Sequence, residues 1–144
     1  MSKIKIITKN KKEKIKMKEL VMYRCEVCGN LICMIEDSGI VPECCGSEMT
    51  RIVANIEDAS AEKHVPVVQR NGLNVQILVG GLPHPMTPTH HISCIILLTT
   101  RGVYMRRLKN DDAAEAIFNI RVDEDVISVY AWCNLHGLWK SESV

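Results

Sequence analysis

The sequence predicts a mainly β protein in which a small metal-binding domain precedes a β-sandwich or barrel. Five of the seven cysteines fall within residues 17–53, a stretch with few other residues that could form a core. From residue 54 onward, short apolar or alternating runs, several of them β-branched, are separated by Gly, Pro, Asn or Asp. The length of 144 residues accommodates one ordinary domain or two small ones. We therefore expect an N-terminal extension over 1–16, a metal-binding domain over 17–53 and a β domain over 54–144.

The N-terminal extension, residues 1–16, is dense in lysine and shows no pattern of a packed element. We expect it to be a solvated, poorly ordered tail. Met17 is an alternative start, because the first domain begins directly after it. The other interpretation is a basic patch that attracts an acidic partner protein.

The segment 17–53 is so short that it needs a metal or disulfides to fold. Cys25 and Cys28 form a C-x-x-C knuckle, in which Gly29 relieves the tight turn, and Cys44 and Cys45 supply two more thiolates. Four thiolates make a closed site for zinc or a single iron. The second pair is adjacent in sequence, so both sulfurs reach one ion only with a distorted angle. A structural zinc ribbon remains an alternative at this point.

The segment 54–144 is expected to contain at least five strands. The runs that predict them are 74–79, 92–99, 103–108, 116–121 and 127–132. Residues 100–102 have the composition of a hairpin turn between two of these strands. Residues 58–62 are expected to begin one short helical turn, with Asp58 or Ser60 as its N-cap.

A second set of metal ligands is distributed over the same segment. It consists of four histidines and one cysteine: His64, His84, His90, Cys133 and His136. His136 follows Cys133 at ligand spacing, and the prolines of 85–88 exclude a regular helix between His84 and His90. Four imidazoles and one thiolate exceed what tetrahedral zinc requires and fit iron with one open coordination position. A four-ligand zinc site with one spare histidine is the alternative that the pattern leaves open.

Composition narrows the classes of function. The 18 basic and 17 acidic residues nearly cancel, which gives no reason to expect a nucleic-acid partner. No apolar run approaches the ~20 residues of a membrane-spanning helix, and the N-terminus lacks the apolar stretch of a secretory signal. We therefore expect a cytoplasmic protein with no membrane contact, whose thiols stay reduced and are accounted for by metal.

Several motifs together resemble one family. This chain contains segments that resemble the active-site segments of desulfoferrodoxins. They are EKHVP at 62–66, HPM at 84–86, His90 six residues after His84, and CNLHGLWK at 133–140. YRCEVCGN at 23–30 and ECCG at 43–46 resemble the desulforedoxin-like domain of the same family. The resemblance covers about residues 17–142, and the combination of CNLHGLW with EKHVP is far more specific than C-x-x-C alone.

The resemblance implies a desulforedoxin-like iron domain followed by an immunoglobulin-like β-sandwich, assembled as a homodimer. It implies two iron ions per chain, one in an Fe(Cys)4 centre and one in a square-pyramidal Fe(His)4Cys centre with Cys133 axial. The implied ligands are Cys25, Cys28, Cys44 and Cys45 in the first centre, and His64, His84, His90, His136 and Cys133 in the second. The implied activity is superoxide reductase, the one-electron reduction of superoxide to hydrogen peroxide in oxidative-stress defence. Rubredoxin or a similar small protein would be the electron donor.

Two residues beside the first histidine are candidates for catalysis. The Lys63 ammonium would attract superoxide and stabilise the developing peroxide charge next to His64. The family suggests that Glu62 occupies the sixth coordination position of the resting ferric enzyme. Outside this context, Glu62 and Lys63 would be a solvated pair on a loop.

The chain departs from the family at its third histidine. Many relatives continue this segment as HYIEW, whereas here His90 is followed by His91, Ile92, Ser93 and Cys94. His91 therefore competes with His90 for the ligand role, although the six-residue spacing from His84 favours His90. If the strand at 92–98 extends back to these residues, neighbouring side chains point to opposite faces and only one of the two can face the iron. Cys94 and Cys33 are expected to fill apolar core.

Two other functions remain as alternatives. A zinc ribbon fused to a β-sandwich could serve as a binding module, with colourless protein and no redox activity. A non-enzymatic electron carrier would have a second iron shielded from solvent. Loss of Lys63 would slow a reductase and leave a carrier unaffected.

Overall fold

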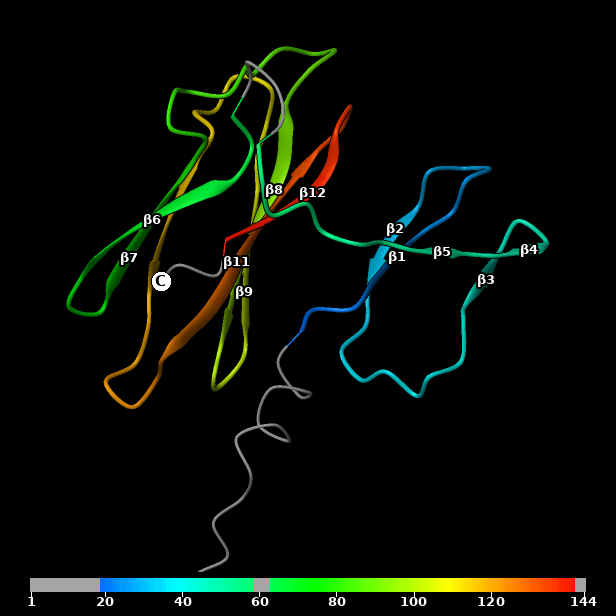
Figure 1. Ribbon diagram of the computed structural model, residues 1–144, viewed down its shortest axis with the longest axis horizontal. Helices are drawn as coiled ribbons and strands as arrows, with labels where there is room; N and C mark the ends of the chain where they lie inside the picture. The colour runs from blue at the N-terminus through cyan, green and yellow to red at the C-terminus, as the bar shows by residue number, and fades with distance from the viewer. Residues whose placement is uncertain (1–18, 59–62, 142–144) are drawn as a thin grey trace, which may run out of the picture.

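The computed structural model describes residues 19–58 and 63–141, and all regular structure within these ranges is β (Figure 1). The chain forms two units that lie side by side. The smaller unit contains β1 (Met22–Arg24), β2 (Leu31–Cys33), β3 (Glu43–Cys44), β4 (Ser47–Glu48) and β5 (Thr50–Arg51). The larger unit contains β6 (Pro66–Asn71), β7 (Asn74–Val79), β8 (Ile92–Thr99), β9 (Val103–Arg107), β10 (Glu115–Asn119), β11 (Val126–Cys133) and β12 (Gly137–Ser141).

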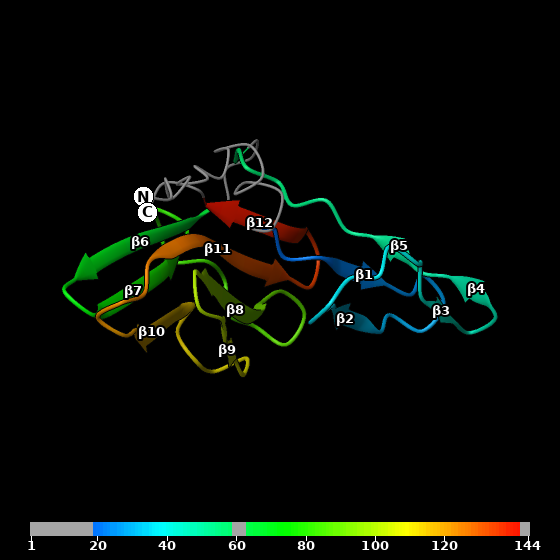
Figure 2. The ribbon, with the colours of Figure 1, turned by 90° about the horizontal axis from the view of Figure 1, so that it is seen from below.

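The larger unit is a sandwich of two antiparallel sheets (Figure 2). One sheet has the strand order β10-β7-β6 and the other β12-β11-β8-β9. Strand β7 alternates, with Val75, Ile77 and Val79 buried in the core and the residues between them partly exposed. This period of two is what a sheet with one solvated face requires. The mainly β fold that the sequence predicts is confirmed.

Strand β8 is buried on both faces, which explains why its sequence is continuously apolar over residues 94–98. Ile95 and Leu97 pack into the sandwich core, whereas Cys94 and Ile96 belong to a second cluster on the opposite face of the sheet. That second cluster is completed by the smaller unit, through residues that include Met22. The smaller unit therefore covers the outer face of the four-stranded sheet.

The smaller unit has little core of its own. Its strands form a three-stranded sheet, β2-β1-β5, and a separate β3-β4 hairpin. The buried residues of its own cluster are Tyr23, Cys25 and Met49. So few buried side chains cannot offset the entropy of ordering a unit of this length, so a bound metal must contribute to its folding.

Both ends of the smaller unit are attached to the β11–β12 hairpin. At its start, Glu19 pairs with Lys140 at 3.5 Å and the Leu20 amide donates to the Tyr130 hydroxyl at 3.3 Å. At its end, Asn55 forms a parallel bridge with β12, in which its amide donates to Leu138 O and its carbonyl accepts from Lys140 N, both at 2.8 Å. The same hairpin carries Cys133 and His136 at its turn.

The strands compare closely with those predicted. β7 and β8 have the predicted bounds, and residues 100–102 form the turn of the β8–β9 hairpin, where the Thr99 amide donates to Gly102 O. The other three predicted strands are present with ends shifted by one or two residues. The sequence reasoning missed β6 and β12, which carry polar residues at several positions. Most of the predicted helical turn and all of the lysine-dense tail lie outside the described residues.

Candidate metal centres

Four cysteines converge at the far end of the smaller unit, in what we call the four-cysteine site. Cys25 and Cys28 come from the turn after β1, and Cys44 and Cys45 from the β3–β4 turn, and their sulfurs all lie within 4.8 Å of one another. The Cys28–Cys44 and Cys44–Cys45 sulfur distances are 3.7 and 3.9 Å. Four thiolates bound tetrahedrally at ~2.3 Å from one ion are about 3.8 Å apart, so these sulfurs fit one metal ion.

The adjacent cysteines reach one ion because of an unusual backbone conformation. Cys45 has φ of 53°, in the left-handed region, and Gly46 follows with φ of 77°. An L-residue adopts this region only at a cost, which the surrounding structure must offset. The distortion expected from the sequence is therefore accommodated at the Cys45 backbone.

Two thiols of this site have pKa values that are shifted in opposite directions. The Cys28 amide donates to the Cys25 sulfur at 3.5 Å and lowers the pKa of Cys25 to about 6. Hydrogen bonds with the Cys28 and Cys44 sulfurs raise the pKa of Cys45 to about 12. The raised pKa of Cys45 disfavours its thiolate, and a bound metal ion would stabilise the thiolate form that ligation requires.

The second cluster, which we call the histidine–cysteine site, lies in three loops at one end of the sandwich. His64 precedes β6, His84 and His90 lie in the β7–β8 connection, and Cys133 ends β11 with His136 in the following turn. The ligand atoms of His64, His84, His90 and Cys133 lie within 4.8 Å of one another. His136 Nδ1 joins them, at 3.0 Å from His64 Nε2 and 3.7 Å from the Cys133 sulfur.

The four imidazole rings form a square. Ring centroids are 4.6 Å apart for His64–His84, 4.7 Å for His84–His90, 5.0 Å for His90–His136 and 4.8 Å for His136–His64. The His64–His90 diagonal is 6.3 Å, and neighbouring rings are inclined by 63° to 82°. Two nitrogens bound at right angles at ~2.1 Å from one ion are about 3.0 Å apart, the distance seen between His64 and His136. The donor set therefore fits one metal ion with four nitrogens and one sulfur.

His64 is fixed from three directions. The Asp58 carboxylate accepts hydrogen bonds from the His64 amide at 2.6 Å and the Val65 amide at 3.2 Å, and lies 4.0 Å from His64 Nδ1. Trp139 stacks on the ring at 4.5 Å between centroids and 16° between planes. Gly80, with φ of +82°, donates its amide to Val65 O. These contacts turn Nε2 of His64 toward the other ligands.

The histidine–cysteine site is buried on one side and open on the other. His64, His84 and Cys133 are buried, His90 is half-buried, and His136 and Lys63 are exposed. His84 is oriented by its Nδ1, which lies 2.8 Å from the carbonyl of Pro85, so that Nε2 faces inward. A small molecule can therefore approach the site from the side of His136.

The remaining candidates lie elsewhere. Glu62 is outside the described residues. His91 is not among the residues whose ligand atoms cluster at the histidine–cysteine site, and its Nδ1 lies 2.9 Å from the carbonyl of Thr87. Cys94 is buried between the two units and burial raises its pKa to about 11, while the half-buried Cys33 packs on the same apolar cluster.

Sequence reasoning missed four residues that shape the histidine–cysteine site: Asp58, Gly80, Thr87 and Asn134. Asp58 is, with Ser60, a candidate helix cap in the sequence, and in the structure its carboxylate binds the amides of the His64 loop. Asn134 lies within the CNLH motif, which was a signal for it. Thr87 and Gly80 stand beside prolines and glycines that mark loops, and nothing in the sequence alone gives them partners.

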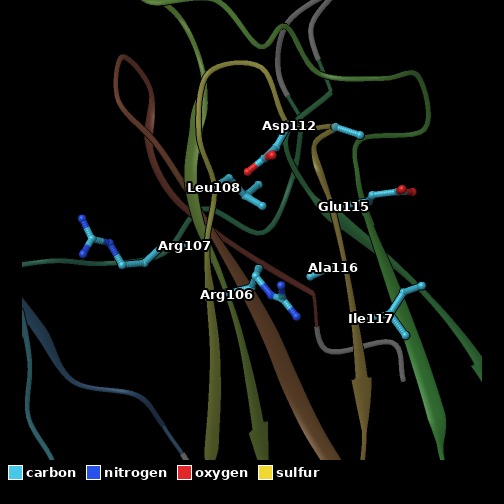
Figure 3. Close-up of a pocket in the computed structure, with 8 residues that line it drawn as sticks. Arg106, Arg107, Leu108, Asp112, Glu115, Ala116 and Ile117 are labelled. Carbon is cyan, nitrogen blue, oxygen red and sulfur yellow. The ribbon is translucent and has the colours of Figure 1, made fainter.

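A pocket of about 350 Å³ lies apart from both metal sites (Figure 3). It opens between the edge strands β9 and β10 and is lined by residues that include Arg106, Leu108 and Asp112. No cysteine or histidine of the described residues lines it, so it has none of the chemistry of the two sites.

No helix in the described part of the chain is long and apolar enough to cross a membrane.

Comparison with known proteins places this geometry in a family. The family profile described as Desulfoferrodoxin matches residues 56–142. The desulfoferrodoxin homologue of Methanothermobacter thermautotrophicus is 38% identical over 118 residues, which cover 82% of this chain and 94% of that protein. The chain belongs to the desulfoferrodoxin family. The desulfoferrodoxin of Clostridium acetobutylicum is 39% identical over 126 residues, covering 86% of this chain and 97% of that relative.

A solved structure agrees with the desulfoferrodoxin assignment. The superoxide reductase from Treponema pallidum matches with a TM-score of 0.75 and 31% identity, over 86% of this chain and 98% of that chain. The four-cysteine site and the histidine–cysteine site of this chain match the two-iron members of the family. The iron cofactors expected from the sequence are thus confirmed.

Proposed function

We propose that this desulfoferrodoxin is a superoxide reductase. The observation that carries the proposal is the square of four imidazoles beside one buried thiolate, open to solvent at His136. Nitrogen and sulfur donors in this number suit iron with a vacant position better than closed tetrahedral zinc. The similarity to the Treponema pallidum superoxide reductase supports the same reaction.

The proposed ligands follow from the two sites. The first iron is assigned to Cys25, Cys28, Cys44 and Cys45, and the second to His64, His84, His90, His136 and Cys133. Ferrous iron in the second site would supply one electron and an open position for the anion. One superoxide, one electron and two protons from solvent give one hydrogen peroxide.

Lys63 is proposed to attract the substrate. It is exposed and directly precedes the buried His64 in the sequence, which supports this role. A fixed positive charge raises the local concentration of a small anion and stabilises negative charge that develops there. Lys63 could also orient the water that delivers a proton.

Cys133 and Glu62 are assigned the remaining roles. The Cys133 side chain is fully buried at the end of β11, and as a metal ligand its sulfur would donate electron density to the iron away from water. Glu62 is proposed to occupy the sixth position in the resting oxidised state, as the family suggests. Each turnover consumes one electron, so we propose a rubredoxin-like electron donor in the cytoplasm. Separately, the family resemblance leads us to propose that the protein is a homodimer.

The experiment that tests the function joins metal analysis with kinetics. Protein purified without chelators should contain two irons per chain and show the bands of both centres, and the ferrous form should react with superoxide in a second-order process. Lys63→Ala should slow that reaction by about tenfold or more at low ionic strength, because electrostatic attraction of the anion is lost. Lys109→Ala, which removes an exposed lysine from another loop, is the control and should leave the rate unchanged. One zinc per chain without a chromophore would contradict the proposal.

A further inference from the structure

The third histidine of the histidine–cysteine site is held by a residue from a different loop. Asn134 lies between Cys133 and His136, yet its side chain bonds to the loop that carries His90. Its Nδ2 donates to the Thr89 carbonyl at 3.0 Å, and its Oδ1 accepts from the His91 amide at 2.8 Å. Its own backbone amide donates to the His91 carbonyl at 3.1 Å. These bonds tie together two of the three loops that form the site.

The partners of Asn134 are the residues on either side of His90. A single side chain therefore holds the backbone before and after this histidine. The contact requires one donor and one acceptor at the end of a short side chain. The side-chain amide of asparagine provides both. Aspartate would keep the acceptor and lose the donor, and alanine would lose both.

Thr87 holds the same histidine from within its own loop. Its amide donates to the His90 carbonyl at 2.9 Å, and its hydroxyl bonds both the His90 carbonyl and the His90 amide at 3.1 Å. The backbone of His90 is thus fixed on its own loop by Thr87 and across to the Cys133 loop by Asn134. Loops without such bonds would leave the side chain free to sample other positions.

His91 adds a third restraint on the outside of the loop. Its Nδ1 lies 2.9 Å from the Thr87 carbonyl, and an N–H on Nδ1 completes a hydrogen bond there. The ring is therefore directed at the loop backbone, while the neighbouring His90 ring stands in the square. This arrangement gives adjacent histidines two different tasks.

We propose that Asn134 is a positioning residue that sets His90 relative to Cys133 and His136, and that His91 braces the same loop without binding the metal. The inference rests on the ligand assignment of the proposed function and does not depend on which substrate is reduced. Residues that orient metal ligands typically contribute about 10- to 100-fold to metal affinity. Asn134→Ala should therefore release iron from the histidine–cysteine site about 10- to 100-fold faster than the parent protein.

The test uses the full chain with both sites loaded with iron. A colorimetric chelator removes ferrous iron, samples are withdrawn and reoxidised, and the remaining band of each centre is recorded. Asn134→Ala should accelerate loss from the histidine–cysteine site and leave loss from the four-cysteine site unchanged, so the four-cysteine site is an internal control. Asn134→Asp should give an intermediate rate. Asn74→Ala is the matched control, because it removes a side-chain bond to Asn119 on the three-stranded sheet.

Three results would overturn the inference. Release from the histidine–cysteine site of Asn134→Ala at the parental rate would remove the positioning role. Equal acceleration at both sites would indicate general destabilisation instead. If His91→Phe abolished the oxidised band of the histidine–cysteine site, His91 would be a ligand. The inference instead requires that His91→Phe keep this band at its parental position. It also requires that iron release be accelerated less in His91→Phe than in Asn134→Ala. Failure of the iron-loaded parent to react with superoxide would remove the proposed function alone.

Discussion

The guanidinium carbon of Arg24 lies 5.9 Å from the centroid of the Trp132 ring. Arg24 ends β1 and is followed by Cys25 of the four-cysteine site, and Trp132 is followed by Cys133 of the histidine–cysteine site. Both side chains are half-buried at the junction of the two units. One cation–π contact therefore joins the two backbone segments that present a site cysteine on each side.

Removal of this contact should weaken the docking of the two units. Arg24→Gln and Trp132→Leu, with the double variant, form a cycle whose coupling energy we expect to be about 0.5–1 kcal/mol. The measurement is the shift of the thermal unfolding midpoint of the iron-loaded protein. Arg24→Lys retains the cation and should recover part of the loss, and Arg106→Gln on the edge strand β9 is the matched control. A coupling energy of zero would show that the two side chains are neighbours without energetic consequence.

Gly80 should tolerate no side chain. A Cβ at this position would collide with the carbonyl oxygens of Lys63 and Leu82, the latter at 2.7 Å, and φ of +82° is unfavourable for any L-residue. Gly80→Ala should therefore destabilise the protein by at least about 1–3 kcal/mol and displace the loop that carries His64.

Gly81 provides the comparison for Gly80. A Cβ there meets no atom within 4 Å, and its φ lies outside the left-handed region. Gly81→Ala should stay within about 0.5 kcal/mol of the parent. Thermal unfolding and the iron content of both variants are the measurements, and equal behaviour of the two alanine variants would contradict the steric argument.

At the end of the sandwich opposite the histidine–cysteine site, a buried carboxylate should make the stability of the fold depend on pH. Glu124 accepts hydrogen bonds from the Thr99 hydroxyl, from Tyr104 Oη at 2.8 Å and from the Arg121 amide at 3.0 Å. Burial raises the pKa of Glu124, and the hydrogen bonds outweigh it, so its pKa lies below the ordinary 4.5. Because the folded-state pKa is depressed, the stabilisation is complete above pH 4.5 and is lost as the pH falls through the folded-state pKa.

The variant that isolates this carboxylate is Glu124→Gln. The new amide group would point a donor at the three donors that bond the Glu124 carboxylate. This should lower the free energy of unfolding by about 1–3 kcal/mol at neutral pH. The stability difference between the parent and Glu124→Gln should shrink as the pH falls below 4.5. Glu115→Gln, at an exposed position on β10, controls for the effect of acid on the metal sites. A difference that stays constant with pH would show that Glu124 is not ionised in the folded protein.

The relation of sequence to structure differs between the two units. β7 and β8 could be predicted to the residue because Val75, Ile77 and Val79 alternate and because residues 92–99 are mostly apolar, with an uninterrupted apolar run at 94–98. That run leaves open what covers its second face, and only the structure shows Met22 of the smaller unit against Ile96. β6 and β12 were missed because polar residues such as Gln69, Arg70 and Lys140 interrupt the apolar pattern, although the strands are paired along their length.

The clustering of these cysteines and histidines could be anticipated from the C-x-x-C and CNLH motifs together with the family resemblance, and the structure brings them together in two groups. The residues that position them could not, because aspartate, threonine and asparagine in loops usually cap turns or face solvent. Asp58 is the clearest case: local sequence offers it, with Ser60, as a helix N-cap, and nothing local points to the bonds that its carboxylate accepts from the amides of His64 and Val65.

Asp58 should therefore control metal retention through the His64 loop. Asp58→Ala removes the acceptor for two amides and should weaken iron binding at the histidine–cysteine site by about 10- to 100-fold. Asp58→Asn retains an acceptor oxygen for the His64 amide and should lose less. Asp37→Ala is the matched control, because Asp37 accepts only the Gly39 amide in its described hydrogen bonds, in an exposed turn of the smaller unit. The measurement is the iron affinity of each variant, determined by chelator competition. An affinity in Asp58→Ala equal to that of the parent would refute the prediction.

Disruption of the four-cysteine site should unfold the smaller unit and uncover the sandwich. Cys28→Ser removes one of the four thiolates, and the few buried residues of this unit cannot hold it together without metal. Its loss would expose Cys94, Ile96 and Tyr130, which it covers in the folded chain. Cys94 is therefore a built-in reporter of docking, because its burial protects it and raises its pKa to about 11.

The measurement is labelling of Cys94 by a thiol reagent, located by peptide mass spectrometry. In the iron-loaded parent, Cys94 should stay unlabelled under conditions that label Cys94 in Cys28→Ser. The histidine–cysteine site lies in loops of the sandwich, so its oxidised band should survive in the same variant. Leu135→Ala, at an exposed loop position, is the control for a substitution that leaves the docking intact. Protection of Cys94 in Cys28→Ser would show that apolar packing alone holds the smaller unit on the sheet, and that the metal at the four-cysteine site is dispensable for its fold.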